Sequence, residues 1–366
     1  MTLLIAGAGL AGARCAETLR SLGWPGRIVL AGDEPHEPYE RPALSKELLA
    51  GTRTTIALRP TEFWADYGIE LQTGKRVHAL NLSRRTADVG SERVSWDALV
   101  IATGARPRRL DGPRGVHHLR TLDDARALAA DVGPRSHLVV VGAGFIGAEV
   151  ASSLTPFVRS VTMVEPLPSP LQRILGNEVG TVLARRYRAH GVDLRLGVGV
   201  EGFIGADRVR AVRLQDSTLL RADVVVVGIG TVPSGPDGGA VETDSVGRTA
   251  WPDVYACGDV ALWDRPRLGR LRIEHWSNAA GQGSAVARAI AGDPSPFDET
   301  PYFWSDQFGI RLQHVGHAES WHRVELDGDD DSFTARYVDE HGRLLAALAA
   351  NRPAETGSLR RELAAA

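Results

Sequence analysis

One glycine pattern occurs twice in this chain, each time directly after a short apolar run. Residues 7–12 (GAGLAG) follow the run 3–6, and residues 142–147 (GAGFIG) follow the run 137–141. The spacing G-x-G-x-x-G between a strand and a helix is typical of a dinucleotide-binding βαβ unit, where backbone approaches a pyrophosphate at the helix N-terminus. Two copies about 135 residues apart therefore predict two nucleotide-binding domains of α/β class.

An acidic residue follows each glycine pattern at the distance expected for a ribose ligand. Asp33 lies 21 residues after Gly12, and Glu165 lies 18 residues after Gly147. A carboxylate at this place accepts hydrogen bonds from a free ribose and repels a 2′-phosphate. Because no arginine follows Glu165 before Arg173, we expect the second site to prefer NADH over NADPH. A merely solvated Glu165 would leave that choice open.

The composition of the chain excludes several other classes of protein. The 366 residues carry a net charge of −3, which argues against a general nucleic-acid binder. The two cysteines cannot build a disulfide framework and fit a reducing cytoplasm, and no apolar run is long enough to predict a membrane span. The eleven histidines are scattered, so no metal site is expected, and the pair His117-His118 is interpreted as a surface turn.

Two dinucleotide sites in one chain imply two dinucleotides, and hydride transfer from a nicotinamide to a flavin is the chemistry that uses both. The first site is therefore predicted to hold FAD and the second to take NADH. Further apolar strands are expected at 98–102 and 224–227. After residue 301 an alternating pattern predicts a small antiparallel α+β region with a terminal helix over 355–366.

Several longer motifs make the chain resemble the FAD-dependent pyridine nucleotide reductases, and within them the oxygenase-coupled NADH:ferredoxin reductases. General to that superfamily are the two glycine patterns, residues 102–104 (ATG) and residues 256–259 (ACGD); more specific are residues 41–46 (RPALSK), 272–279 (RIEHWSNA) and 303–307 (FWSDQ). The resemblance implies two Rossmann-like domains in a glutathione-reductase-like arrangement. It implies an FAD-binding domain at 1–112 and 239–302, an NAD-binding domain at 113–238 and a C-terminal α+β domain at 303–366.

The resemblance and the motifs together give a set of expected cofactor-binding residues. For FAD these are Gly9, Ala11, Asp33, Arg41, Lys46, Val77, Arg120, Asp259 and Trp276. The other residues expected to bind one of the two cofactors are Gly7, Leu10, Gly12, Ala102, Thr103, Gly104, Gly142, Gly144, Phe145, Ile146, Gly147, Glu149, Glu165, Gly228, Ile229, Gly230, Gly258, Glu274, His275 and Trp304. Asp259 has a second interpretation as a helix cap, and Cys257 beside it is interpreted as a small packed side chain.

Three residues are predicted to act in catalysis. Lys46 lies where related flavin enzymes place redox cysteines, and residues 41–46 contain none, so electrons are expected to leave the flavin directly. We expect Lys46 beside the flavin ring, Glu149 pointing at the nicotinamide, and a contact between them. Trp304 is expected near the flavin on the acceptor side, and Arg59 is a weaker candidate for contacting an acidic ferredoxin. Ordinary surface or core positions are the alternative for each.

The function implied is an FAD-dependent NADH:ferredoxin oxidoreductase that passes single electrons to a [2Fe–2S] ferredoxin feeding a cytochrome P450 or Rieske oxygenase. Rubredoxin reductase, NADH oxidase or diaphorase, and a non-catalytic NADH-sensing flavoprotein remain alternatives. The chain departs from the family between residues 231 and 253, where a compact glycine- and proline-rich stretch replaces a helical segment. The tail region is shortened too, and both departures affect the expected docking surface for the acceptor.

Overall fold

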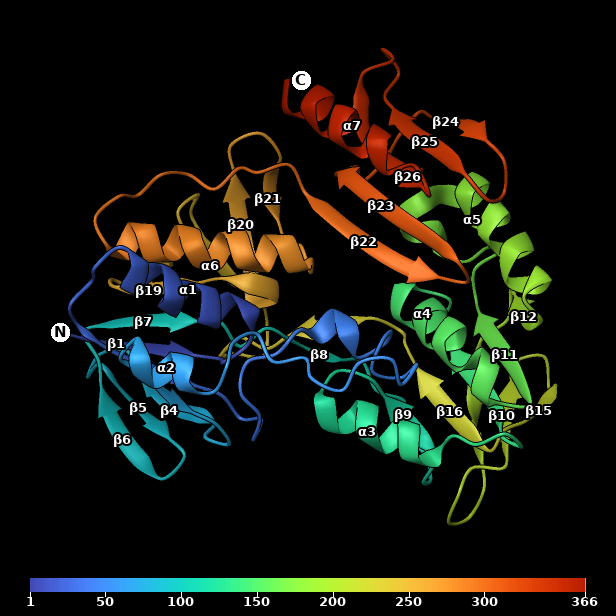
Figure 1. The fold of residues 1–366 in the computed structure, drawn as a ribbon, viewed down its shortest axis with the longest axis horizontal. Helices are drawn as coiled ribbons and strands as arrows, with labels where there is room; N and C mark the ends of the chain where they lie inside the picture. Colours follow the sequence, from blue (N-terminus) through green and yellow to red (C-terminus); the bar gives the residue numbers. More distant parts are fainter. Residues whose placement is uncertain (366) are drawn as a thin grey trace. The chain divides into compact units, whose positions relative to one another are not determined.

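The computed structural model describes residues 1–365, which fold into two compact units (Figure 1). The first unit contains residues 1–40, 55–106 and 232–301, and the second contains residues 41–54, 107–231 and 302–366. The chain passes between the units at five points, after residues 40, 54, 106, 231 and 301, and two of these points lie inside the short strands β8 (Ala105–Pro107) and β17 (Thr231–Pro233). The expected division into three domains, with separate boundaries at 112, 238 and 302, is kept below as a proposal.

The first unit is built on a parallel sheet with the strand order β19-β7-β1-β2-β3. Its central strands are unbroken apolar runs because both faces of the sheet are covered: Leu3, Leu4 and Ile5 have no exposed surface. Helices α1 and α6 lie side by side over the sheet (Figure 1). This arrangement places the end of β1 and the start of α1 together at the carboxyl edge of the sheet, where open α/β sheets bind ligands.

The first elements of this unit follow the predicted order of strand, glycine turn and helix. The elements of the first unit are β1 (Thr2–Ala6), α1 (Leu10–Ser21), β2 (Arg27–Ala31), α2 (Glu62–Asp66), β3 (Ile69–Gln72), β4 (Val77–Asn81), β5 (Thr86–Val89), β6 (Glu92–Ser95), β7 (Ala98–Ile101), β18 (Val241–Thr243), β19 (Val254–Ala256), the 3-10 turn η3 (Gly258–Val260), β20 (Ala261–Arg265), β21 (Gly269–Leu271) and α6 (Trp276–Ile290).

The second unit repeats the same architecture with the parallel order β12-β11-β10-β16-β9. It adds an antiparallel sheet with the order β22-β23-β26-β25-β24, on which α7 packs against β23 and β26. All four strand pairs of this sheet are antiparallel, as the pattern after residue 301 predicts, and its central strand β26 is almost entirely buried. The predicted α/β class with a C-terminal α+β region is confirmed.

The elements of the second unit are the 3-10 turn η1 (Arg41–Ala43), β9 (Val116–His118), α3 (Leu122–Asp131), β10 (His137–Val141), α4 (Phe145–Leu154), the 3-10 turn η2 (Thr155–Phe157), β11 (Ser160–Glu165), α5 (Gln172–Ala189), β12 (Val192–Leu196), β13 (Val200–Ile204), β14 (Ala211–Leu214), β15 (Leu219–Arg221), β16 (Val224–Val227), β22 (Tyr302–Gln307), β23 (Ile310–Gly316), β24 (Arg323–Gly328), β25 (Phe333–Val338), β26 (Leu344–Ala350) and α7 (Pro353–Ala365).

The interpretation of His117-His118 as a surface turn is wrong. Both residues lie in β9, which pairs with β16, and His118 is only 7% exposed. Burial lowers the pKa of His118, with a further contribution from Arg109, so the ring stays neutral and accepts the backbone N–H of Leu110 at 3.2 Å. The sequence shows no strand signal here because β9 is a three-residue strand at the edge of the sheet, in which two of the three side chains are polar histidines.

Two features are absent from the described part of the chain, a membrane-spanning helix and a metal-binding cluster. Within residues 1–365, no helix is both long and apolar enough to cross a membrane. No group of three or more histidine, cysteine, aspartate or glutamate side chains in that range is arranged to hold a metal ion.

Candidate nucleotide-binding and electron-transfer site

The first glycine turn is shaped by close backbone approach at its outer glycines. Gly7 has a φ of +119°, and a Cβ there would overlap the carbonyl oxygen of Ala102 at the end of β7. A Cβ on Gly12 would overlap the carbonyl oxygen of Gly7. In contrast, a Cβ on Gly9 would meet nothing within 4 Å. The middle glycine therefore borders open space, which is the room a pyrophosphate needs.

The second glycine turn repeats this geometry residue for residue. Gly142 has a φ of +98°, and its Cβ would overlap the carbonyl oxygen of Gly228 after β16. The Cβ of a residue replacing Gly147 would overlap the carbonyl oxygen of Gly142, whereas one at Gly144 would lie no closer than 4.0 Å to another atom. Both turns thus offer the same kind of opening in front of a helix.

The two helices that follow these turns begin without a side-chain cap. Gly9 and Gly144 are the N-cap residues of α1 and α4, and within the described residues no side chain accepts the first N–H groups of either helix. Helix α3 is different, because Thr121 and Asp124 form a capping box at its start. Uncapped N–H groups and the positive end of the helix dipole favour a bound anion. The residues present fit a dinucleotide phosphate at each turn.

The two predicted ribose acids lie in different surroundings. The Asp33 side chain is exposed, two residues beyond β2, and its carboxylate has no hydrogen-bond partner within residues 1–365. Glu165 is the last residue of β11 and accepts the backbone N–H of Ala143 at 2.9 Å and that of Leu167 at 3.1 Å. The second acid is therefore fixed by its own glycine turn, and each oxygen keeps a lone pair for a further donor.

The ACGD motif closes the first site from the side of α6. Gly258 has a φ of +78°, and a Cβ there would lie 2.9 Å from the Cβ of Ala11. Its N–H is bonded to Oε1 of Gln282 at 2.8 Å. Asp259 lies in η3, and its backbone carbonyl oxygen accepts a hydrogen bond from the guanidinium of Arg272. The same guanidinium forms an ion pair with Glu274, whose Oε1 lies 2.5 Å away. The motif therefore brings Asp259 and the start of α1 into one neighbourhood.

Lys46 and Glu149 are in contact, as expected. The Lys46 ammonium lies 2.8 Å from Oε2 of Glu149, and the Glu149 side chain is only 3% exposed. Two hydroxyls that were not predicted also donate to this carboxylate: Ser45 to Oε2 at 2.5 Å, and Ser305 to Oε1 at 2.6 Å. A buried carboxylate needs such partners to remain charged.

Trp304 lies on the opposite face of β22 from this carboxylate. Alternation along the strand directs Phe303 and Ser305 toward α4, where Phe303 packs edge-on against Phe145 at 4.7 Å. The Trp304 ring instead stacks beside Tyr302, with centroids 6.3 Å apart. The FWSDQ motif thus has two functions built into one strand, a polar contact to Glu149 and an aromatic surface.

The other predicted cofactor residues divide between the two units. In the first, Val77 begins β4, Thr103 donates to the carbonyl of Ser234 at 2.7 Å, Leu10 opens α1, Gly104 follows β7, and His275 and Trp276 form the start of α6. In the second, Arg41 donates to the carbonyl of Arg120 at 2.6 Å, and Ile146, Ile229 and Gly230 are exposed around the second turn.

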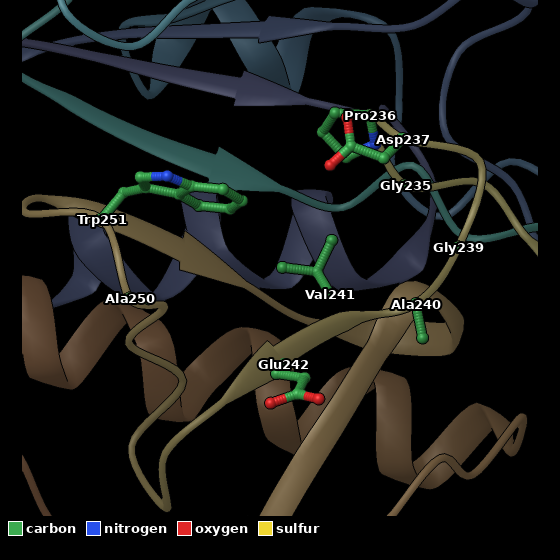
Figure 2. A pocket seen from close by; sticks show the side chains of 9 residues that line it. All are labelled: Gly235, Pro236, Asp237, Gly239, Ala240, Val241, Glu242, Ala250 and Trp251. Atoms are coloured by element: carbon green, nitrogen blue, oxygen red, sulfur yellow. The ribbon is translucent and has the colours of Figure 1, made fainter.

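The first unit contains two cavities, one of which is lined by the expected FAD residue Trp276 and by Arg59, the candidate for contacting ferredoxin. A polar cavity of about 580 Å³ opens between α1 and α6, and its charged lining consists of Arg14, Glu17, Arg59, Arg288 and Glu299. Glu17 is held by Arg14 at 2.7 Å and by Arg59 at 3.0 Å. The other cavity, of about 260 Å³, lies in the compact segment after β17, and Figure 2 shows Trp251, Pro236 and Val241 among the side chains that line it.

Comparison with known proteins agrees with this geometry. The model of the family described as pyridine nucleotide-disulphide oxidoreductase matches residues 1–283, and that described as reductase C-terminal matches residues 302–366. The chain belongs to the pyridine nucleotide-disulphide oxidoreductase family. The predicted class of flavoprotein oxidoreductase, with FAD and a nicotinamide nucleotide, is confirmed by this membership.

Relatives place the chain among the ferredoxin reductases of this family. It is 38% identical to the 5,5'-dehydrodivanillate O-demethylase ferredoxin reductase subunit of Sphingobium sp., over 95% of this chain and 90% of the relative. It is 34% identical to putidaredoxin reductase of Pseudomonas putida, over 96% and 89%. The crystal structure of the covalent putidaredoxin reductase–putidaredoxin complex matches with a TM-score of 0.95 and 33% identity, over 99% of this chain and 92% of that one. The predicted resemblance is confirmed.

Proposed function

We propose that this chain takes a hydride from NADH onto bound FAD and delivers single electrons to a [2Fe–2S] ferredoxin that supplies a cytochrome P450 or Rieske oxygenase. The observation that carries the proposal is the pair of matching glycine turns, each leaving open space before an uncapped helix. Bound flavin supplies the chemistry that links a two-electron donor to a one-electron acceptor. The residues of the protein bind and orient the nucleotide that donates the electrons and the protein that accepts them.

The first turn is assigned to FAD and the second to NADH. Asp33 is exposed and available to a ribose of FAD, while Asp259 and Ala11 lie together at the same edge of the first sheet. In the second unit, Glu165 offers its remaining lone pairs to the adenosine ribose of NADH. The negative charge of Glu165 disfavours a 2′-phosphate at the same place, which supports NADH as the donor.

Lys46 and Glu149 are assigned to the nicotinamide end. Glu149 accepts one hydrogen bond on each oxygen and forms an ion pair with Lys46 through Oε2, so an ionised carboxylate with about four lone-pair sites keeps one acceptor position on Oε1. The carboxamide N–H of a nicotinamide fits that position. Lys46 neutralises the buried charge, and neither residue has to transfer a proton for a hydride to move.

Protein thiols have no part in the proposed cycle. Residues 41–46 contain no cysteine, and both cysteines of the chain are fully buried. Burial raises the pKa of Cys15 well above its usual value and that of Cys257 to about 12, so neither is a thiolate near neutral pH. Because the thiolate is the reactive form, the electrons leave through another route. The low cysteine content also supports a cytoplasmic setting.

Two separate groups are candidates for contacting the acceptor, an aromatic one in the second unit and a basic one in the first unit. Trp304 faces away from Glu149 and is assigned to the acceptor side of the flavin. Arg14, Arg59 and Arg288 outnumber Glu17 and Glu299 around the polar cavity, which favours an acidic partner. We keep the three-domain division, with FAD held by residues 1–112 and 239–302, NADH by 113–238, and the acceptor side completed by 303–366.

An anaerobic titration tests the proposal. Purified protein should carry yellow flavin that one equivalent of NADH bleaches, and cytochrome c reduction should then depend on an added [2Fe–2S] ferredoxin. Arg59→Ala should raise the ferredoxin KM about fivefold at low salt and less at high salt, whereas Arg93→Ala, which removes an exposed arginine paired with Asp88 in the same unit, should not. Protein without flavin, or bleaching without ferredoxin-dependent turnover, contradicts the proposal; the second result favours an NADH-sensing flavoprotein.

A further inference from the structure

A buried chain of polar side chains leads from α5 through β22 to Glu149. The Tyr187 hydroxyl donates to Oε1 of Gln307, Nε2 of Gln307 donates to Oγ of Ser305 at 3.1 Å, and Ser305 donates to Oε1 of Glu149 at 2.6 Å. Tyr187 is completely buried, and Gln307 and Ser305 are no more than 2% exposed. None of the three was expected from the sequence to take part in the site.

The direction of this hydrogen-bond chain is determined at its far end. Burial raises the pKa of Tyr187, and the charge of Glu149 raises it further, so the phenol keeps its proton and acts as the donor. The amide oxygen of Gln307 therefore accepts, which turns its NH₂ group toward Ser305. Ser305 has a single hydroxyl hydrogen, and with its oxygen already accepting from Gln307, that hydrogen points at Glu149.

The result is a carboxylate held from two sides. Ser45 and Lys46 fix Oε2, whereas within residues 1–365 only Ser305 holds Oε1, the oxygen that keeps an open acceptor position. The side-chain rotamer of Glu149 consequently depends on a strand of the tail region, which family comparison places in a separate matched segment, residues 302–366. Buried networks with every member satisfied fix a single geometry.

We propose that Ser305, oriented by Gln307 and Tyr187, is a positioning residue that aims the open acceptor position of Glu149 at the nicotinamide carboxamide. This rests on the proposed function, because it requires that Glu149 meets the nicotinamide. Ser305 does not itself touch the nucleotide; it acts by fixing the oxygen that does.

The test compares ligands that share the adenosine half and differ at the nicotinamide. Affinities are measured by calorimetry on the oxidised FAD-loaded protein for NAD⁺, for ADP-ribose, and for the 3-acetylpyridine analogue of NAD⁺, which lacks the amide N–H. Ser305→Ala should weaken NAD⁺ about tenfold, as expected for a lost hydrogen bond to a charged group. It should leave ADP-ribose unchanged and affect the acetylpyridine analogue much less. Tyr187→Phe should act in the same direction with a smaller effect.

Ser152→Ala is the matched control. Ser152 lies on α4, like Glu149, and accepts the backbone N–H of Phe308 at 2.6 Å. Its replacement therefore weakens the packing of α4 against the segment after β22 without removing a hydrogen bond to Glu149. It should leave all three affinities unchanged. The proposal is overturned if Ser305→Ala binds NAD⁺ like wild type, if it weakens ADP-ribose equally, or if Ser152→Ala reproduces its effect.

A third variant separates this inference from the function on which it rests. Glu149→Gln should weaken NAD⁺ relative to ADP-ribose. If it does so while Ser305→Ala has no effect, Glu149 meets the nicotinamide and only the positioning role fails. If Glu149→Gln leaves NAD⁺ binding unchanged, the assignment of Glu149 to the nicotinamide fails, and the inference fails with it.

Discussion

The two glycine turns are built alike but end in different acids. In each, the first and third glycines make backbone contacts that no side chain would allow, and the middle glycine borders open space. The strand registers pair Ala6 with Ala31 in the first unit and Val141 with Val164 in the second, so Gly32 and Glu165 occupy equivalent positions. The acid of the first unit, Asp33, therefore lies one residue further along the chain than the position equivalent to Glu165.

Packing explains this offset. A Cβ at Gly32 would lie 2.7 Å from the Cβ of Ala8, so an acidic side chain cannot be accommodated at that position without movement. At the equivalent place in the second unit, Glu165 reaches the backbone N–H of Ala143 instead. The first site consequently has a free acid, Asp33, whereas the second has an acid built into the turn. Two sites with the same pattern thus differ in how far they are preorganised.

A second difference follows two residues after the third glycine. Arg14 occupies that place in the first turn and Glu149 in the second. Arg14 is 29% exposed and lines a polar cavity, whereas Glu149 is 3% exposed and bonded to Lys46. Equivalent helix positions therefore carry opposite charges. This difference fits the proposal that the first turn only holds its nucleotide, whereas the helix after the second turn also contacts the nicotinamide of NADH.

The largest expected effect comes from the third glycine of each turn. Gly12→Ala should abolish FAD retention, because the new Cβ overlaps the carbonyl of Gly7, and the purified protein should be colourless. Gly147→Ala should keep the yellow flavin and weaken NADH by about 5- to 150-fold, since overpacking costs about 1–3 kcal/mol. Flavin absorbance and an NADH titration distinguish the two. Equal loss of flavin in both variants would contradict the assignment of the turns.

Lys46→Met should give the next largest effect. Removing the ammonium leaves Glu149 buried with only hydroxyl partners, and the nicotinamide then loses its fixed position. Rapid-mixing measurements should show flavin reduction by NADH about 100-fold slower, as for a misplaced reacting group. Lys75, the chain's other lysine, is 38% exposed and pairs with Glu92, so Lys75→Met is the matched control. An unchanged rate in Lys46→Met removes Lys46 from the mechanism.

The sequence was sufficient to predict the fold and the glycine turns at which the two nucleotides are expected to bind. Glycine spacing and buried strands predict both βαβ units, because those signals are local and sterically forced. The contact between Lys46 and Glu149 was also foreseen from the family resemblance. Ser45, Ser305 and Tyr187 were missed because a serine or tyrosine gains its role only from what lies opposite it in space. The alternation of FWSDQ is the one local signal that would have placed Ser305 opposite Trp304.

The charge at the end of β11 should set cofactor choice with a smaller effect. Glu165→Arg removes a negative charge and supplies a donor to a 2′-phosphate, so the ratio of kcat/KM for NADPH to that for NADH should rise about tenfold to a hundredfold. Asp33→Ala should weaken FAD retention and leave this ratio unchanged. A change of the ratio in Asp33→Ala, or none in Glu165→Arg, would show that the two acids do not serve separate nucleotides.

The smallest expected effect lies at α3, which supplies its own cap. Thr121→Ala removes the hydroxyl that accepts the N–H of Asp124 at 3.1 Å and should cost about 1 kcal/mol of stability, a Tm decrease of roughly 2–4 °C. Because α3 does not depend on a nucleotide for its N-terminus, the decrease should be the same with and without saturating NAD⁺. Helix α4 begins at Phe145, after the N-cap Gly144, with no side-chain acceptor in the described structure, so we expect a bound phosphate to supply the partner of its first turn. A Tm loss in Thr121→Ala that NAD⁺ abolishes would mean that α3, too, is completed by the nucleotide.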